Sequence, residues 1–160
     1  MPTEPTVVLQ RTTPEFVRVP VGGATPFGAG AAVSAAVSQV IDGAIGGSFN
    51  NGHFQLVIPP GAFSGTASLT ITVPDPSVMQ CELHISPPEA NRFAVPVQLV
   101  ADCGTATGLN AWAMRTLWFD ESQLQWVVVS GTTVNTTEAK IMTPLSHFSE
   151  YGVVDGKAGW

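Results

Sequence analysis

The clearest fold signal in this chain is the stretch His53-Phe54-Gln55-Leu56-Val57-Ile58-Pro59-Pro60-Gly61. Its apolar residues Phe54, Leu56 and Ile58 alternate with the other three, and a period of two is that of a strand with one buried face. An Asn51-Gly52 pair stands just before the stretch, and Asn-Gly is the strongest short hairpin signal. The two prolines and Gly61 end the strand, because proline cannot donate a ladder hydrogen bond. The stretch therefore predicts a half-buried β-strand bounded by turns.

Similar patterns extend in both directions. Residues 37–42 favour a strand entering a tight turn, although the apolar residues of 31–45 also fall at helical spacing. Further strands are expected at 69–73, 81–85, 95–103, 112–119, 124–129, 139–142 and 145–154. About eight to nine short strands without a convincing helix predict an all-β fold, a two-sheet antiparallel β-sandwich with an extended N-terminal arm.

A chain of 160 residues has the size of one domain, and three parts are expected within it. Residues 1–36 are a Pro/Gly-rich extended arm, residues 37–154 are the sandwich, and residues 155–160 are a tail. Segments of this kind can become ordered on a partner. We expect the apolar side chains of the arm and tail to contact a protein partner, namely Phe16, Val17, Val19, Phe27 and Trp160.

Charge is scarce in this chain, at 11% of residues, with twelve acids, six Lys or Arg and a net charge of −6. The absence of a basic run argues against nucleic-acid binding. Two readings of the low charge stay open: a sandwich with Ser and Thr outside, or a surface covered by a partner. No signal peptide is visible, and the apolar stretch 28–41 is too short for a spanning helix.

The two cysteines suggest a disulfide. If residues 81–85 and 95–103 form a hairpin with Ile85 opposite Leu99, then Cys81 stands opposite Cys103 and a bridge is geometrically plausible. The alternative is two buried free thiols. A bridge would indicate an oxidising compartment, which favours an extracytoplasmic or periplasmic location.

Several segments, in order, resemble the ZU-five domain of ankyrins, UNC-five netrin receptors and zonula occludens one, which has many bacterial relatives. They are Ile45-Gly46-Gly47, Leu56-Val57-Ile58-Pro59-Pro60-Gly61-Ala62-Phe63, Leu69-Thr70-Ile71, Ile85-Ser86-Pro87-Pro88, Phe93-Ala94-Val95-Pro96-Val97-Gln98-Leu99, the strand of Trp126, and His147-Phe148-Ser149-Glu150-Tyr151. The resemblance covers about residues 37–154 and implies a β-sandwich.

Relatives of this kind divide on activity. In the death-domain protein PIDD and the function-to-find domain of inflammasome sensors, the chain cuts itself at a Phe-Ser bond, whereas in ankyrins and netrin receptors the domain is a binding module. Mapped here, the resemblance implies a scissile Phe148-Ser149 bond, with Ser149 as nucleophile and His147 or a cross-strand histidine as base. Attack on the Phe148 carbonyl would need a kinked, strained peptide. The alternative is that Phe148 fills the core while His147, Ser149 and Tyr151 form a polar stripe.

Other site chemistry is thinly represented. The three histidines, His53, His84 and His147, show no ligand spacing, and the cysteines do not form a C-x-x-C pattern, so no metal or cofactor is predicted. Trp112, Trp118 and Trp126 fall in expected strands and should be core, which argues against a carbohydrate-binding platform.

These observations favour a non-catalytic structural or binding module of a bacterial kind. We expect an accessory subunit that docks on and stabilises a larger protein assembly, without spanning a membrane itself but compatible with a membrane-extrinsic position through a partner. Self-cleavage at Phe148-Ser149 is the first alternative and a carbohydrate-binding sandwich is the second.

Overall fold

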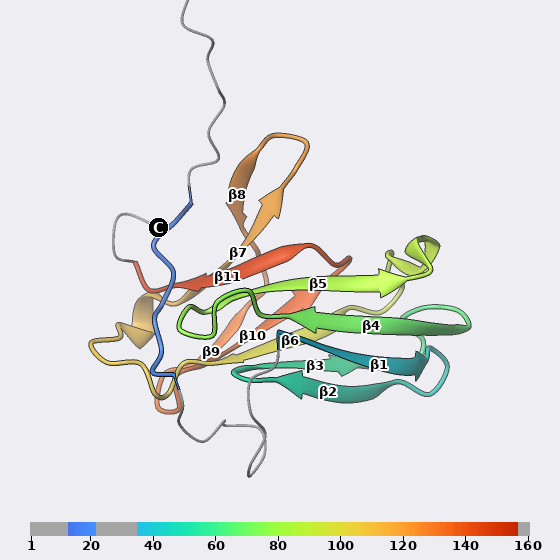
Figure 1. Cartoon of the computed structure of the whole chain (residues 1–160), viewed down its shortest axis with the longest axis horizontal. Coiled ribbons are helices and arrows are strands. Elements are labelled where there is room, and N and C mark those ends of the chain that lie inside the picture. The colour runs from blue at the N-terminus through green and yellow to red at the C-terminus, as the bar shows by residue number, and fades with distance from the viewer. Residues whose placement is uncertain (1–12, 22–34, 157–160) are drawn as a thin grey trace, which may run out of the picture.

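The structure is a computed structural model that describes residues 13–21 and 35–156, and it is a sandwich of two antiparallel sheets (Figure 1). In spatial order, the six-stranded sheet consists of β1 (Ala36–Asp42), β4 (Thr66–Thr72), β5 (Gln80–Ser86), β11 (Glu150–Val154), β7 (Arg115–Asp120) and β8 (Gln125–Val128). The five-stranded sheet consists of β2 (Gly47–Asn51), β3 (Phe54–Ile58), β6 (Val97–Asp102), β10 (Lys140–Leu145) and β9 (Thr133–Asn135). The fold class predicted from the sequence is confirmed.

The described residues contain more strands than the eight to nine expected, six in one sheet and five in the other. Two of them lack a clear alternating pattern in the sequence. β2 is the first arm of a hairpin with β3, turning at the predicted Asn51-Gly52 pair, and β9 is a three-residue edge beside β10. Both form because a neighbouring strand supplies the hydrogen-bond ladder.

Two short 3-10 helices, η1 (Pro88–Ala90) and η2 (Ala111–Ala113), connect strands. Trp112 lies in η2 with 87% of its surface exposed, so the expected strand over 112–119 begins only at Arg115 and the expected burial of Trp112 is wrong. No helix within residues 13–21 and 35–156 is long and apolar enough to cross a membrane.

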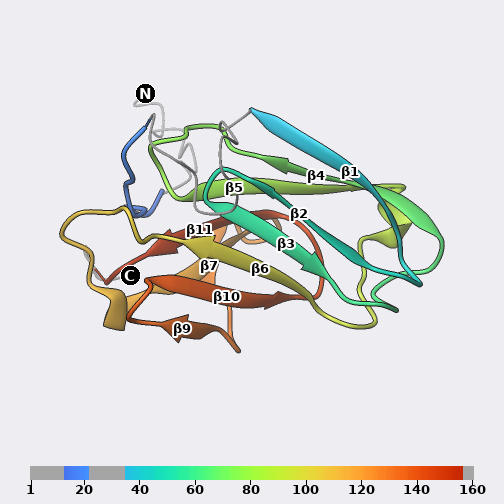
Figure 2. The ribbon, with the colours of Figure 1, turned by 90° about the horizontal axis from the view of Figure 1, so that it is seen from below.

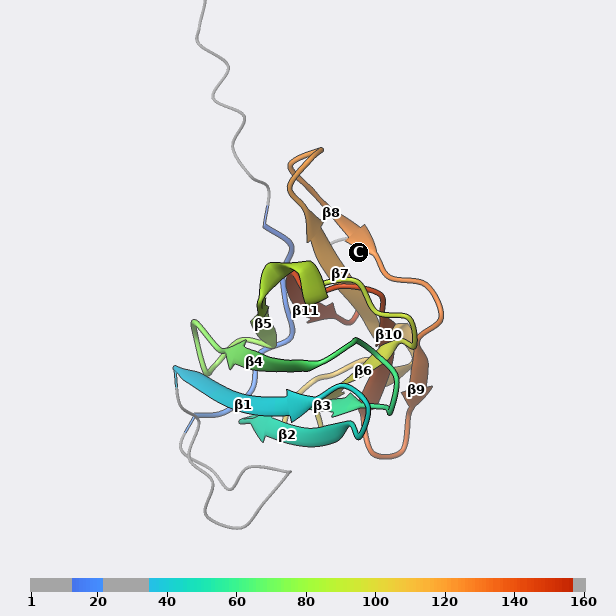
Figure 3. The ribbon, with the colours of Figure 1, turned by 90° about the vertical axis from the view of Figure 1, so that its right-hand side faces the viewer.

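The core lies between the two sheets and is built from every second residue of the strands. Leu56 of β3 pairs with Leu99 of β6, and Leu69 of β4 pairs with Ile85 of β5. These side chains are buried. Figure 3 shows the sandwich from one end, with β1 above β2 at one margin and β9 at the other. The alternation seen in the sequence therefore corresponds to an inner face in each sheet.

The arm segment 13–21 lies at the end of β11 and beside the residues that precede β5, with Val17 and Val19 in the main core and Phe16 on the outer face of the sheet. The Val17 N–H donates to the Val153 carbonyl, and the Val17 carbonyl accepts from Met79, both at 2.8 Å. Phe16 packs edge-on against Trp126, at 5.0 Å between ring centroids. A small second core forms there, and its buried members are Phe16, Leu117, Phe119, Trp126 and Val154.

This packing corrects the role expected for the arm. Phe16, Val17 and Val19 are only 5–6% exposed, so they are buried against their own domain and are not partner-facing side chains. Phe27 and Trp160 lie outside the described residues.

Candidate functional site

The segment His147-Phe148-Ser149 connects the two sheets. Leu145 ends β10 in the five-stranded sheet, and β11 begins at Glu150 in the six-stranded sheet. The single closing strand expected over residues 145–154 is therefore wrong, because the chain leaves one sheet and enters the other within it. The three residues do not alternate between faces as they would in a regular strand.

Phe148 anchors this crossing. Its ring is buried and meets Phe93 edge-on at 4.9 Å. The Asn91 side chain holds its backbone on both sides: the Phe148 N–H donates to Asn91 Oδ1 at 2.5 Å, and Asn91 Nδ2 donates to the Phe148 carbonyl at 3.2 Å. The carbonyl of the Phe148-Ser149 bond thus already accepts a neutral amide donor.

His147 faces the side of the sandwich formed by Trp118 and Tyr151. Its ring lies edge-on to Trp118 at 5.0 Å, and its Nδ1 is 3.5 Å from the Tyr151 hydroxyl. That hydroxyl donates to the His147 carbonyl at 2.6 Å. Burial raises the pKa of Tyr151, which keeps the hydroxyl protonated as a donor. The ring of His147 is therefore part of a structural aromatic cluster.

Ser149 opens toward a different surface. Its hydroxyl donates to the Phe119 carbonyl at 3.2 Å, and its own carbonyl accepts from Leu83 at 2.9 Å. Ser149 lines a pocket of about 370 Å³ together with His84, Asn91 and Phe148, whereas His147 lines another of about 240 Å³ with Trp118 and Tyr151. The structure thus separates His147 from Ser149 and instead brings the cross-strand His84 to the pocket of Ser149.

The two cysteines come from opposite sheets. Cys81 lies in β5, where it pairs with Tyr151 of β11, and Cys103 follows β6. The expected hairpin is wrong, because the connection through η1 carries the chain from one sheet to the other. Both thiols are free and buried. Burial raises the pKa of both, that of Cys103 to about 12, so both thiols are protonated at neutral pH and neither is a thiolate nucleophile.

The remaining titratable groups of the described chain do not gather into a metal site: no cluster of three His, Cys, Asp or Glu occurs there that could hold an ion. His53 is buried beside Asp102, and desolvation lowers its pKa. The Nδ1 atom of His53 has no hydrogen-bond partner. This histidine therefore acts as a neutral core residue at physiological pH.

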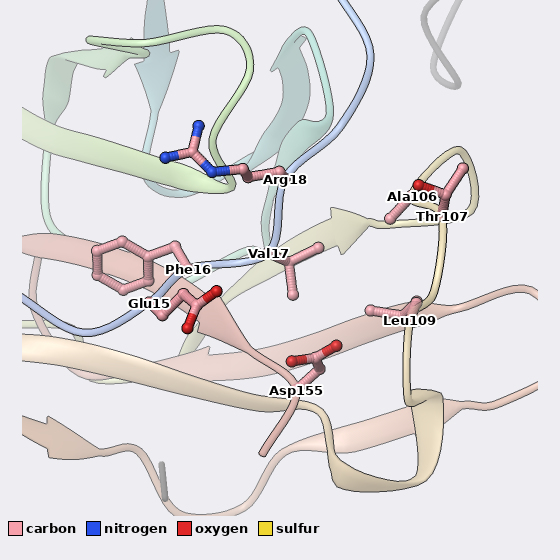
Figure 4. A pocket seen from close by; sticks show the side chains of 8 residues that line it. All are labelled: Glu15, Phe16, Val17, Arg18, Ala106, Thr107, Leu109 and Asp155. Atoms are coloured by element: carbon pink, nitrogen blue, oxygen red, sulfur yellow. The ribbon is translucent and has the colours of Figure 1, made fainter. Parts of the chain in front are cut away.

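A crevice of about 260 Å³ lies beside the arm (Figure 4). Glu15, Phe16, Val17 and Arg18 of the arm line it, opposite Leu109 and Asp155. Asp155 is 5% exposed, and its Oδ2 accepts the Asn110 N–H at 3.3 Å. The buried carboxylate thus holds a loop of its own domain.

The outer face of the five-stranded sheet is unusually poor in charge. Strand register places its outward side chains in rows, and the two middle rows contain Asn50, Gln55, Val100, Met142 and Thr133, then Ser48, Val57, Gln98 and Pro144. None of these nine is charged. We call these two rows the open face, which Figure 2 shows from the side of β3, β6 and β10.

The open face combines exposed apolar groups with uncharged polar ones. Met142 is 43% exposed and Val57 is 37% exposed, whereas Val100, which pairs with Met142, is only 7% exposed. Charge appears only in the next row, where Lys140 is 3.9 Å from Asp102. Helix η2, with the exposed Trp112, lies against β9 at one margin of this sheet. Period-two alternation could have indicated such a face, but only strand order shows that these residues adjoin.

Comparison with known proteins adds no assignment. No protein-family model matches this chain, and no curated protein matches it either. The function is therefore inferred from the residues themselves, and the likeness to the ZU-five domain stays an expectation.

Proposed function

We propose that this chain is a non-catalytic binding module, an accessory subunit that docks through the open face on a larger protein assembly. The partner surface that fits the open face is a protein surface with apolar side chains at its centre and no charge. It would also carry amide and hydroxyl groups that can form hydrogen bonds with this face. A charged surface such as nucleic acid would find little to pair with there.

One observation carries the proposal, namely that the open face has nine outward side chains without a charge. A solvated sheet face ordinarily carries Lys, Glu and other charges, and depletion of charge is what distinguishes the centre of an interface. The outer face of the six-stranded sheet is different, since Glu82 and Glu150 stand side by side on it. Trp112 adds an exposed aromatic group at the margin, of the type that anchors interfaces.

The closing segment supports a non-catalytic reading. The Ser149 hydroxyl bonds the Phe119 carbonyl and His147 bonds Tyr151, so neither is aimed at the other. Asn91 grips the Phe148 backbone, and the buried ring of Phe148 fills the core. These contacts account for the residue types in structural terms.

The test is a charge placed at the centre of the open face. The tagged full chain is expressed in its source organism as wild type, as Met142→Lys and as Leu124→Lys, and the native size of each is measured by sedimentation. Leu124 is the matched control, because it is 47% exposed but lies in the β7–β8 turn. We expect the wild type and the control to sediment with a larger assembly and Met142→Lys to sediment free. A free wild-type chain, or an assembly indifferent to Met142→Lys, would refute docking through this face.

Self-cleavage at Phe148-Ser149 is the second candidate, and one observation favours it. His84, Asn91, Phe148 and Ser149 line the same pocket, which offers a cross-strand base, a donor to the scissile carbonyl and a nucleophile. In that reading Ser149 Oγ attacks the Phe148 carbonyl, the bond to the Ser149 nitrogen breaks, and water later opens the ester. Intact mass after denaturation tests it: fragments ending at Phe148 and lost in Ser149→Ala and His84→Ala would establish cutting, while one full-length mass excludes it.

A carbohydrate-binding sandwich is less well supported. Such a platform needs aromatic side chains exposed in a row, and among the described tryptophans Trp112 is exposed, Trp118 is half-buried and Trp126 is 5% exposed.

A further inference from the structure

Strand β1 is an edge of the six-stranded sheet with unusual features. It pairs with β4 in an unbroken register from Ala36↔Thr72 to Asp42↔Thr66, and within the described residues no strand lies on its other side. The other edges are shorter: β2 has five residues, β8 has four and β9 has three, against seven in β1. Proteins ordinarily protect sheet edges with short strands, bulges, prolines or lysines. β1 has none of these.

The single charge of β1 is withdrawn from the edge. The Asp42 carboxylate accepts the Ala44 N–H at 2.9 Å. The Asp42 carbonyl accepts from Ile45 at 3.0 Å and from Gly46 at 2.8 Å. Asp42 therefore serves the turn after β1, and the free edge ahead of it is uncharged.

The alternation of hydrogen-bonded residues along β1 shows which of its backbone N–H and C=O groups point away from β4. At one end of β1 the Val73 N–H donates to the Ala35 carbonyl, and at the other the Gly43 N–H donates to the Gly65 carbonyl. Bonded pairs recur at every second residue of an antiparallel ladder, so the odd-numbered residues of β1 bond β4. The N–H and C=O groups of Ala36, Ser38 and Val40, together with the Asp42 N–H, point outward.

We propose that β1 pairs antiparallel with β1 of a second copy of this chain, about a two-fold axis at Gln39. Ser38 then exchanges two hydrogen bonds with Val40 of the second copy, and the Asp42 N–H donates to the Ala36 carbonyl of that copy. The two-fold axis repeats the Ser38–Val40 bonds and the Asp42–Ala36 bond in the other direction. Each outward group named above therefore gains a partner, except the Ala36 N–H. A register centred on Val40 leaves three of these groups without partners, namely the Ala36 N–H and C=O and the Ser38 N–H. A register centred on Ser38 leaves one, the Asp42 N–H, but it sets apolar Val37 opposite Gln39. The two six-stranded sheets would become continuous.

The side chains of β1 are complementary to themselves in this register, which is what a two-fold interface requires. On the inner side, half-buried Val37 meets Ile41 of the second copy and extends the core. On the outer side, Ser38 meets Val40, which is 65% exposed in one copy. The two Asp42 residues stand at opposite ends, about 20 Å apart for a six-residue separation. Gln39 faces its own counterpart, and this polar pair disfavours a slipped register.

Cross-linking tests both the partner and the register. Gln39 forms the non-hydrogen-bonded pair on the axis, where Cα atoms are about 4.5 Å apart and within the range of about 4.4–6.8 Å that a disulfide spans. The full chain carrying Gln39→Cys should give a covalent dimer on mild oxidation, and Val57→Cys, exposed on the other sheet, should not. Cys81 and Cys103 are buried and do not compete.

A second pair of variants tests the hydrogen bonds. Val40→Pro removes an outward N–H without touching the bonds to β4, while Val40→Thr keeps it. We expect wild type and Val40→Thr to be dimers by sedimentation equilibrium and Val40→Pro to be a folded monomer, with circular dichroism as the check on folding. A wild type that stays monomeric through the micromolar range would overturn the proposal, as would Gln39→Cys that cross-links no faster than Val57→Cys. Efficient cross-linking through Ser38→Cys instead would show a slipped register and overturn the pairing.

Discussion

Replacing Gly152 with alanine should dislodge Phe16 from the six-stranded sheet. A Cβ atom at Gly152 would lie 2.2, 2.5 and 2.7 Å from three atoms of the Phe16 ring. Gly152 cannot retreat, because it is paired with Gln80 on one side and Leu117 on the other. No left-handed backbone is required there, so the penalty of alanine is the collision alone.

The size of the effect follows from what Phe16 loses. Its side chain is 6% exposed and packs edge-on against Trp126. Full burial of a phenylalanine contributes about 1.5–3 kcal/mol, and an aromatic pair adds about 0.5–1.5 kcal/mol. If the ring is expelled, we expect the free energy of unfolding to fall by about 3 kcal/mol. For a domain of this size that lowers Tm by about 6–12 °C.

A double-mutant cycle isolates the contact. Wild type, Phe16→Ala, Gly152→Ala and the double variant are unfolded with denaturant, and the four free energies are compared. Both single variants should be destabilised, and Gly152→Ala should cost almost nothing when Phe16 is already alanine, because no ring remains to collide with. The coupling should therefore approach the whole cost of Gly152→Ala, well above the scatter of about 0.5 kcal/mol for independent sites. Additive single effects would refute the claim that Phe16 rests on Gly152.

Three further outcomes are expected. Asn91→Ala should lower the free energy of unfolding by about 1–3 kcal/mol in denaturant unfolding, because two backbone groups of Phe148 lose their partner. Asn91→Asp keeps only the acceptor and should also be destabilised. An Asn91→Ala variant as stable as the wild type would contradict the role given to these two hydrogen bonds. A thiol reagent should label neither Cys81 nor Cys103 in the native protein, since both are buried thiols with raised pKa values. It should label both once the protein is unfolded without reductant. No labelling of the unfolded protein would mean that the two cysteines are bridged. Burial lowers the pKa of His53 in the folded protein, so as pH falls below about 6.5 the imidazole is protonated in the unfolded chain before it is protonated in the folded one. The wild type should therefore lose stability below that pH, and His53→Asn should lose it less steeply. Parallel stability profiles of the two proteins against pH would contradict this.

Much of the fold was open to prediction because alternation is a local property. In residues 54–58 and 69–73 the buried positions recur at every second residue, and this period reports a strand with one buried face whatever its neighbours are. The Asn51-Gly52 turn was equally predictable, since the backbone conformation of a hairpin turn depends on the two residues at its centre. β9 was not visible, because its three residues owe their strand conformation to β10.

The candidate sites were harder to foresee. His147 and Ser149 are two residues apart in the sequence, yet the crossing between sheets turns them to different pockets. His84 is remote in the sequence and shares the pocket of Ser149. A sheet crossing has no local signature, since it depends on which sheet can accept the next strand.

The sequence by itself determined the secondary-structure class, the low charge of the surface and the half-buried character of most strands, because each depends on residue type and spacing within a few positions. Only the tertiary structure decided strand order, and with it the sheets to which Cys81 and Cys103 belong, the burial of Phe16 over Gly152, the rows of the open face and the free edge of β1. These depend on contacts between residues far apart in the chain. Such contacts depend on how the two sheets pack as a whole. The alternation of apolar and polar residues along one strand does not specify which other strand pairs with it.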